Sequence, residues 1–260
     1  MIQLAANLTM LFPELPFTDR FAAARAAGFT AVEFLFPYQW PAEQLHEKIK
    51  QSGVKQVLFN LPPGDWDKGE RGLACLPGRQ DEFQESVGRA IEYAKVLETP
   101  RMHCMAGVIP EGAQAEALQE TYVENLKFAA RACERENIGI LIEPINPFDV
   151  PGYFLNYSNQ ALDILQRASH PNLKLQYDLY HMHRIGDDMP SFIAKNIGHI
   201  AHFQVAGHPG RHEPDCGEVP YSAAFDAINA QDYAGWIGCE YIPESTTLAG
   251  LTWAEHWLNT

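Results

Sequence analysis

The sequence predicts an α/β fold, a single (β/α)8 barrel (TIM barrel) over residues 1–260, with its active site at the C-terminal ends of the strands. Three observations favour this class. The 260 residues are close to the roughly 250 typical of such barrels. Short apolar runs alternate with helical segments along the chain. Three of these runs end on a carboxylate, and the carboxyl ends of barrel strands converge on one face.

The first half of the chain contains four expected pairs of strand and helix. The strands are short apolar runs, and the helices repeat apolar side chains every three or four positions. Gly28 and Gly53 end the first two helices, as glycine commonly does. The expected strands are 3–8, 31–36, 55–60 and 101–107, and the expected helices are 18–27, 41–52, 80–98 and 115–136.

The second half repeats the alternation and begins with an apolar run, residues 140–142, between Gly139 and Pro144. This run is too short for a helix and proline stops it, so it predicts a buried strand. An open doubly wound sheet is the alternative, but no glycine-rich phosphate loop follows the first strand. The later expected strands are 173–178, 199–207 and 236–240, and the expected helices are 159–168, 190–196, 222–230 and 248–258.

One connection, residues 61–79 (LPPGDWDKGERGLACLPGR), interrupts this alternation. A connection of this length without periodicity is usually functional or disordered. It carries Trp66, Lys68, Arg71 and Arg79 among glycines and prolines. We expect an ordered lid over the mouth of the barrel, and the alternative is a surface excursion.

The composition disfavours several kinds of partner. With 33 acidic and 19 basic residues, the formal net charge is −14, which disfavours nucleic acid and anionic membranes. We find no signal peptide and no run near the ~20 apolar residues of a membrane span. The five cysteines form no CxxC pair. We therefore expect reduced thiols in a cytoplasmic protein, without a zinc site or a disulfide framework.

Four side chains with oxygen atoms stand at the ends of the last four expected strands: Glu143, Asp178, Gln204 and Glu240. The intervals of 35, 26 and 36 residues between them each fit one β/α unit. Together they could surround one divalent cation, and three carboxylates with one amide oxygen favour Mg²⁺ or Mn²⁺ over Zn²⁺. Taken singly, each has an ordinary alternative, such as an ion pair with a neighbouring Arg or, for Asp178, the N-cap of a helix beginning LYHM.

Two further side chains follow these strand ends. His181, three residues after Asp178, can hydrogen-bond a bound oxyanion, and an ordinary loop histidine is its alternative. Arg211, seven residues after Gln204, can hold a carboxylate through two hydrogen bonds, and a surface salt bridge is its alternative. His103 in the fourth strand could line the pocket or be a satisfied core histidine, and we favour the latter.

These residues belong to motifs that resemble hydroxypyruvate isomerases over nearly the whole chain: NLTMLFPE, FLFPY, GDWDKGERGLACLPGR, LIEPINPFDVPGY, LQYDLYHM, RHEPDCGE and WIGCEY. The wider superfamily is similar to the xylose-isomerase-like barrels, which include ketose 3-epimerases and type IV apurinic endonucleases. The resemblance implies catalytic glutamates at Glu143 and Glu240, and a metal held by these two with Asp178 and Gln204. The related epimerases carry a histidine where this chain has Gln204, so the metal's identity does not transfer.

The resemblance implies a reaction that interconverts hydroxypyruvate and 2-hydroxy-3-oxopropanoate (tartronate semialdehyde), a step of glyoxylate and carbohydrate metabolism. The two glutamates would remove and return a proton through a metal-assisted enediolate. The epimerases' substrate contacts fall on Asp149, His181 and Arg211. The lid residues Arg71 and Arg79 are further candidates to hold the substrate carboxylate, and the lid would exclude water.

Several alternatives stay open. The nearest is an isomerase or epimerase of a larger keto-acid or ketose, such as 2-oxotetronate. A metal-dependent endonuclease is disfavoured by the net charge of −14 and by the few histidines at strand ends. A barrel that only binds a small acid is not excluded by fold. Trp253 and Trp257 fit either a subunit interface or a cover for the barrel bottom, and we favour a homo-oligomer.

Overall fold

In the computed structural model, which describes residues 2–258, eight parallel strands close into a barrel. Each strand pairs with the next along the chain, and β1 pairs with β8 to close the ring. The expected (β/α)8 barrel is confirmed, and the open doubly wound sheet is excluded. The strands are β1 (Gln3–Asn7), β2 (Ala31–Glu33), β3 (Lys55–Asn60), β4 (Arg101–His103), β5 (Gly139–Ile142), β6 (Leu173–Asp178), β7 (Ile200–Val205) and β8 (Trp236–Cys239).

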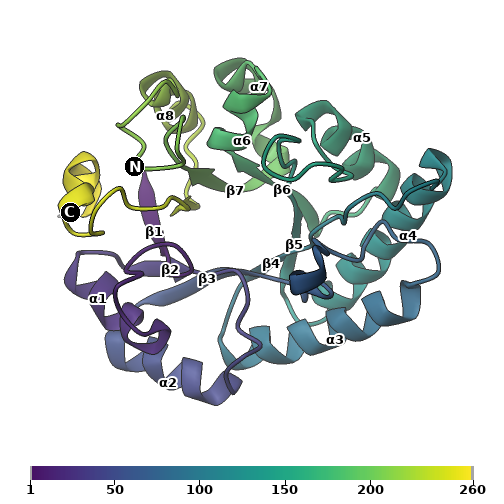
Figure 1. Cartoon of the computed structure of the whole chain (residues 1–260), viewed down its shortest axis with the longest axis horizontal. Helices are drawn as coiled ribbons and strands as arrows, with labels where there is room; N and C mark the ends of the chain where they lie inside the picture. Colours follow the sequence, from purple (N-terminus) through teal and green to yellow (C-terminus); the bar gives the residue numbers. More distant parts are fainter. Residues whose placement is uncertain (1, 259–260) are drawn as a thin grey trace.

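Helices surround the strands on the outside of the barrel (Figure 1). All but the last two helical segments, which follow the eighth strand, lie in the connections between consecutive strands, as parallel pairing requires. No helix among residues 2–258 has both the length and the apolar character needed to cross a membrane. The α-helices are α1 (Arg20–Ala26), α2 (Ala42–Ser52), α3 (Gln80–Val96), α4 (Ala115–Glu134), α5 (Ser158–Ala168), α6 (Leu179–Arg184), α7 (Met189–Asn196), α8 (Tyr221–Asn229) and α9 (Glu255–Leu258), and the 3₁₀ helices are η1 (Phe17–Asp19), η2 (Trp66–Lys68), η3 (Ile197–His199) and η4 (Ala249–Ala254).

The interior of the barrel changes from apolar to polar along the strands. Ala5 and Ala31 belong to a small buried cluster, separate from the main core that packs the strands against the helices. Two positions further along the same strands lie Asn7 and Glu33, both buried. Because side chains alternate between the faces of a strand, these pairs point the same way. The C-terminal half of the interior is therefore polar, and it is at this end that the site lies.

The expected strands, and the expected helices apart from the last, are confirmed with differences at their ends. β2 ends at Glu33 and β4 at His103, earlier than their apolar runs suggested, because the chain leaves the sheet to form the mouth. One helix, α6, follows β6 without a loop. Asp178 caps it, since its Oδ1 accepts the backbone N–H groups of Tyr180 at 2.8 Å and His181 at 3.4 Å. The N-cap alternative for Asp178 is thus confirmed, and it leaves the second carboxylate oxygen available.

The long connection over residues 61–79 is ordered and docks against the loop that follows β4. Gly72 has a φ of +114°, and a Cβ added there would lie 2.2 Å from the carbonyl oxygen of Met105. Only glycine fits this close backbone approach. From this anchored segment Trp66 and Arg71 reach the cavity described below. The segment therefore covers part of the mouth, as expected of a lid.

The last described residues form η4 and α9 rather than the single helix expected over 248–258. Trp253 contacts Tyr241 and Trp257 contacts Phe225, both with steeply inclined rings. The indole N–H of Trp253 donates to the Tyr241 hydroxyl at 3.3 Å. Both tryptophans thus pack on their own chain, and a subunit interface at this place stays a prediction.

Candidate active site

The ends of β5 to β8 bring four polar side chains to one end of the barrel. Glu143 directly follows β5, Asp178 ends β6, Gln204 lies in β7 and Glu240 directly follows β8. None of them is more than 5% exposed. Glu143 and Glu240 both line a cavity of about 270 Å³, and with Gln204 they line a smaller polar cavity. The spacing in the sequence thus identified side chains that the fold brings together, and their roles stay predictions.

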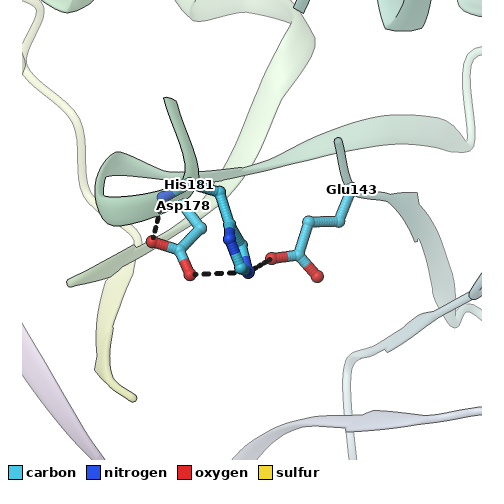
Figure 2. Close-up of side chains that lie close together, drawn as sticks. All are labelled: Glu143, Asp178 and His181. Carbon is cyan, nitrogen blue, oxygen red and sulfur yellow. Dashed lines mark hydrogen bonds and ion pairs between the residues drawn. The ribbon is translucent and has the colours of Figure 1, made fainter. Parts of the chain in front are cut away.

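Within this group, Glu143, Asp178 and His181 form a tighter cluster (Figure 2), with one ligand atom of each within 4.8 Å of the others. His181 Nε2 lies 3.6 Å from Asp178 Oδ2 and 3.9 Å from Glu143 Oε1. Within residues 2–258, neither Asp178 Oδ2 nor Glu143 Oε1 has a hydrogen-bond partner, although both oxygens are buried. Such oxygens are costly to bury unless a proton or a cation satisfies them. These two carboxylate oxygens therefore fit a hard divalent cation.

Asn146 determines which nitrogen of His181 carries the proton of the neutral ring. Its Oδ1 accepts the backbone N–H groups of Phe148 at 3.1 Å and Asp149 at 3.0 Å. Its Nδ2 is therefore the atom 2.6 Å from His181 Nδ1. An amide N–H donates, so Nδ1 accepts and the proton of the neutral ring lies on Nε2. Burial, with the nearby Arg211 adding to it, lowers the pKa of His181 well below its usual value, so the ring is a neutral donor to the site.

The three carboxyl groups share one buried space, which changes their acidity. Burial raises the pKa of Glu143 well above its ordinary value, and the charges of Glu240 and Asp178 raise it further. Burial raises the pKa of Glu240 to about 8 against the opposing charge of Arg211. Burial likewise raises the pKa of Asp178 to about 6, again opposed by Arg211. Carboxyl groups of this kind can accept and return a proton near neutral pH.

Arg211 is the cation of the site. Its Nη2 lies 3.4 Å from Glu240 Oε2 and 3.8 Å from Asp178 Oδ2. Its guanidinium carbon lies 5.1 Å from the centre of the Tyr180 ring. Arg211 lines the cavity, which excludes the alternative of a surface salt bridge. A guanidinium held in this way can bind an anionic substrate next to the carboxyl groups.

Two of the other predicted substrate residues, Arg71 and Asp149, also line the cavity. The guanidinium carbon of Arg71 lies 3.6 Å from the centre of the Trp66 ring, and this contact holds the side chain at the lid. Asp149 pairs with Arg184. The structure therefore places one further cation and one further carboxylate on the wall of the cavity.

Arg79, the remaining predicted substrate residue, lies elsewhere. It is not among the residues that line the cavity. Its guanidinium pairs with Glu70 and, at 2.7 Å, with Glu82, and Glu70 also accepts the backbone N–H of Asp65 at 2.5 Å. Arg79 thus braces the lid segment, because its donors are directed at these two carboxylates. The structure gives no support to its expected role as a substrate ligand.

His103 is a residue of the site that sequence reasoning assigned wrongly. It is 1% exposed and lines the cavity, and neither ring nitrogen has a hydrogen-bond partner within residues 2–258. Its Nδ1 lies 3.5 Å from Glu143 Oε2, and burial lowers the pKa of His103 to about 3. It is not a satisfied core histidine. Its place at the end of β4 was the signal that could have identified it. Further lining residues not predicted are Met10, Leu35, Asn60, Met105, Ile145 and Val150.

Comparison with known proteins agrees with this fold. A family model described as a xylose isomerase-like TIM barrel matches residues 21–257. The chain is 48% identical to the 2-oxo-tetronate isomerase of Cupriavidus necator, over 99% of each chain. It is 44% identical to the hydroxypyruvate isomerase of Escherichia coli, over 98% of this chain and 99% of the relative. The crystal structure of a Brucella melitensis protein named AP endonuclease, family 2, superposes with a TM-score of 0.97 at 42% identity and covers 99% of both chains.

Proposed function

The chain belongs to the xylose isomerase-like TIM barrel family, and from this premise we propose that it is a hydroxypyruvate isomerase. It would interconvert hydroxypyruvate and 2-hydroxy-3-oxopropanoate. One observation carries the proposal: two buried glutamates of raised pKa, Glu143 and Glu240, line one cavity together with Arg211. Two such glutamates can take and return a proton at a carbon next to a carbonyl group, and the arginine can bind the negative charge of a small anionic substrate.

The reaction moves one carbon-bound hydrogen, one hydroxyl proton and the carbonyl double bond. Loss of a proton from C3 of hydroxypyruvate leaves its electron pair to form the C2–C3 double bond of an enediolate. A proton then returns at C2 as the C3 hydroxyl becomes the aldehyde, and the proton that the C3 oxygen loses is matched by one that the C2 oxygen gains to become the hydroxyl. No oxidant is needed, because C3 is oxidised as C2 is reduced. Glu143 and Glu240 are the groups proposed to take and return the carbon-bound proton, since a base works best with a pKa near the operating pH.

We include a divalent cation, Mg²⁺ or Mn²⁺, in the proposed function. The support is the pair of buried oxygens without partners, Glu143 Oε1 and Asp178 Oδ2, and the hard character of the donors. Glu143, Asp178, Gln204 and Glu240 would hold it. When bound, such an ion polarises carbonyl and hydroxyl oxygens as a Lewis acid.

The chain's own cations and donors would hold the substrate. The protein carries a net charge of −14, so a carboxylate substrate requires local positive charge. Arg211 and Arg71 supply it on the cavity wall. The Nε2–H of His181 is directed into the cluster, where it would donate to an enediolate oxygen. Trp66 on the lid segment would help to exclude water from this intermediate.

A second candidate substrate is 2-oxo-tetronate. The Cupriavidus necator relative carries this activity in its name. The cavity adjoins an open outer depression, and Asp149 and Arg211 line both. A four-carbon acid differs from hydroxypyruvate by one CHOH unit, for which this depression offers room. The same proton transfer between C2 and C3 would serve either acid.

The Brucella melitensis protein is named an AP endonuclease, but an endonuclease function is disfavoured for this chain. A net charge of −14 repels the phosphate backbone. Among residues 2–258, the one cluster of His, Cys, Asp and Glu with close ligand atoms contains a single histidine. A cluster of several zinc ions would need more such ligands.

The cysteines support a place in a reducing compartment, and we propose the cytoplasm. All five are free thiols, and four of them are buried. Burial raises the pKa of Cys75, Cys104, Cys133 and Cys239, so these thiols are poor nucleophiles. Unpaired cysteines of this kind are usual in cytosolic proteins.

The experiment that tests the proposed function compares initial rates on the two acids. Purified protein is given hydroxypyruvate or 2-oxo-tetronate, each with Mg²⁺, with Mn²⁺ and with a chelator. We expect cation-dependent conversion of hydroxypyruvate, with kcat/KM at least equal to that for 2-oxo-tetronate. A mock preparation from cells that do not express the protein, purified in parallel, reports any contaminating isomerase. A preference for the four-carbon acid would select the second candidate, and no conversion of either acid would contradict the proposed function.

A further inference from the structure

A row of buried polar side chains links the interior of the barrel to the predicted base. Gln204 Nε2 donates to Glu33 Oε1 at 2.8 Å. Gln176 Nε2 donates to Gln204 Oε1 at 2.6 Å and to Glu143 Oε2 at 2.9 Å. None of these four side chains is more than 4% exposed. They come from β2, β6, β7 and the end of β5, so only the closed barrel brings them together.

The chemistry of these groups gives the row a single direction. An ionised carboxylate only accepts, so Gln204 must turn its nitrogen to Glu33 and its oxygen to Gln176. Gln176 must then present its nitrogen to Gln204, and the second N–H of that nitrogen reaches Glu143. Reversing either amide would bring two acceptor oxygens face to face at hydrogen-bond distance. Glu33 therefore sets the orientation of both glutamines.

The unpaired side-chain oxygen of Gln176 indicates that the orientation of this amide is functional. Gln176 Oε1 is buried and has no hydrogen-bond partner within residues 2–258. Leaving such an oxygen unpaired is unfavourable, and each case in a folded protein calls for an explanation. The explanation here is that Gln176 gives both of its N–H groups to Gln204 and Glu143.

The anchor of the row is itself held firmly. The second oxygen of Glu33 lies 2.6 Å from His202 Nε2, and its first oxygen also accepts from Asn7 Nδ2 at 3.0 Å. Space for this carboxylate comes from Gly238 on β8, where an added Cβ would lie 2.2 Å from Glu33 Oε1. Both oxygens of the Glu33 carboxylate therefore have partners inside the barrel.

We propose that Gln176 is a positioning residue for Glu143 and that Glu33, acting through Gln204, fixes the direction of Gln176. Gln176 holds Oε2 of Glu143 inside the barrel. The other oxygen, Oε1, has no partner among residues 2–258 and is left facing the site where the cation and the substrate would bind. This inference rests on the proposed function, since it assigns Glu143 the role of base.

The first test compares Gln176→Met with Gln56→Met. Gln56 is a matched control, because it is a buried glutamine on β3 whose Nε2 donates to the carbonyl oxygen of Leu58, at 2.6 Å. A hydrogen bond to a charged group is among the stronger ones in proteins, so we expect kcat of Gln176→Met to fall about 10- to 100-fold. Its KM should change less than about twofold, because Gln176 does not line the 270 Å³ cavity and uniform binding is retained. Equal effects of the two substitutions would overturn the proposal.

The second test is a double-mutant cycle with Glu33→Gln, with circular dichroism used to confirm that each variant folds. If Glu33 acts through Gln176, the double variant should be about as slow as the slower single variant. If the two losses in kcat multiply, Glu33 and Gln176 act independently. That result would refute the proposal that Glu33 acts through Gln176. Should Glu33→Gln not fold, Gln176→Asn replaces the cycle. Its shorter amide cannot reach both partners, so it should be as slow as Gln176→Met.

A crystal structure of Gln176→Met gives a readout that does not depend on turnover. We expect the Glu143 carboxylate to occupy one conformer in the unaltered protein, and to rotate or occupy several conformers in the variant. An unchanged Glu143 would overturn the proposal even if the enzyme is an isomerase. Conversely, an unaltered protein that converts neither acid would count against the proposed function and would leave the structural part of this inference standing.

Discussion

The acidity of single side chains decides what this site can do. Glu143 and Glu240 lie in a common buried space, and burial raises the pKa of each. Arg211 opposes the rise at both residues. A carboxylate left in water would be too weak a base for a carbon acid. The two glutamates are therefore basic because the strand ends that carry them are buried, and not because the residue type is unusual.

Replacing either glutamate by glutamine should remove the proposed proton transfer. Glu143→Gln and Glu240→Gln keep size and shape but lose the base, so we expect kcat to fall by about 10²- to 10⁴-fold. Exposed Glu116 on α4 provides the control, and Glu116→Gln should turn over at the unaltered rate. Initial rates with hydroxypyruvate measure the effect. Retained turnover in Glu143→Gln would remove this residue from the mechanism.

Arg211 should act on substrate binding. Arg211→Met removes the cation that lies beside Glu240 and Asp178, so we expect KM for hydroxypyruvate to rise about 10- to 100-fold, as for loss of a charge-assisted contact. The control is Arg167→Met, which removes an exposed arginine paired with Asp163 on α5. Steady-state kinetics on both variants check the result. A KM as low as that of the control would place the substrate carboxylate elsewhere, with Arg71 the next candidate.

The sequence revealed some of these residues and concealed others for a physical reason. A carboxylate that ends a buried apolar run stands out, which is why Glu143, Asp178 and Glu240 were found. Glu33 also sits in such a run, but its importance comes from a partner, His202, that is 169 residues away in the chain. That proximity depends on barrel closure and strand register, which local patterns do not carry.

At the scale of elements, the lid segment separates two arginines that look alike in the sequence. Arg71 reaches the cavity beside Trp66, whereas Arg79 pairs with Glu70 and Glu82. The sequence showed an unusual connection rich in glycine and cations. It could not show which guanidinium turns inward, because that depends on the side chains each one meets.

Matched substitutions should separate the two roles. Arg71→Met should raise KM for hydroxypyruvate several-fold with little change in the free energy of unfolding. Arg79→Met should leave KM within about twofold and lower stability by roughly 0.5 to 1 kcal/mol, as for a partly exposed ion pair. Kinetics and urea unfolding of both variants distinguish these outcomes. The reverse pattern would restore Arg79 as the substrate ligand.

Most elements were predictable because the alternation of short apolar runs with helical segments is a strong signal. The exceptions lie where strands end. β2 and β4 stop before their apolar runs do, and α6 starts directly after the cap residue Asp178. In each case the chain turns at the mouth of the barrel. Tertiary contacts with neighbouring loops decide such turns, and local propensity does not.

At the scale of the whole molecule, the polar end of the barrel creates a pH-dependent weakness. The folded pKa values of Glu240, about 8, and Asp178, about 6, lie above their ordinary values. A raised folded pKa gives stability that is complete below the unfolded pKa and is lost as the pH rises through the folded one. Without a cation, these groups should therefore make the protein less stable at pH 8 than at pH 5.

A bound cation should reverse this trend. Metal ligands must be deprotonated, so the ion competes with protons for these oxygens and binds better at higher pH. We predict that Mn²⁺ raises Tm more at pH 8 than at pH 5.5, relative to protein in chelator. Glu240→Gln should reduce the decrease in Tm between pH 5.5 and pH 8 that is measured in chelator. It should also reduce the increase in Tm that Mn²⁺ causes at pH 8. An equal rise in Tm at both pH values would argue against an ion held by these carboxylates.

Proton transfer by Glu143 and Glu240 through an enediolate is tested most directly by proton NMR of hydroxypyruvate in D₂O with protein and Mg²⁺. We predict loss of the C3 proton signal and, over many turnovers, deuterium at C2 of 2-hydroxy-3-oxopropanoate. This exchange should disappear in Glu143→Gln. Hydrogen that moves from C3 to C2 without any solvent deuterium over many turnovers would indicate a hydride shift and contradict the enediolate mechanism.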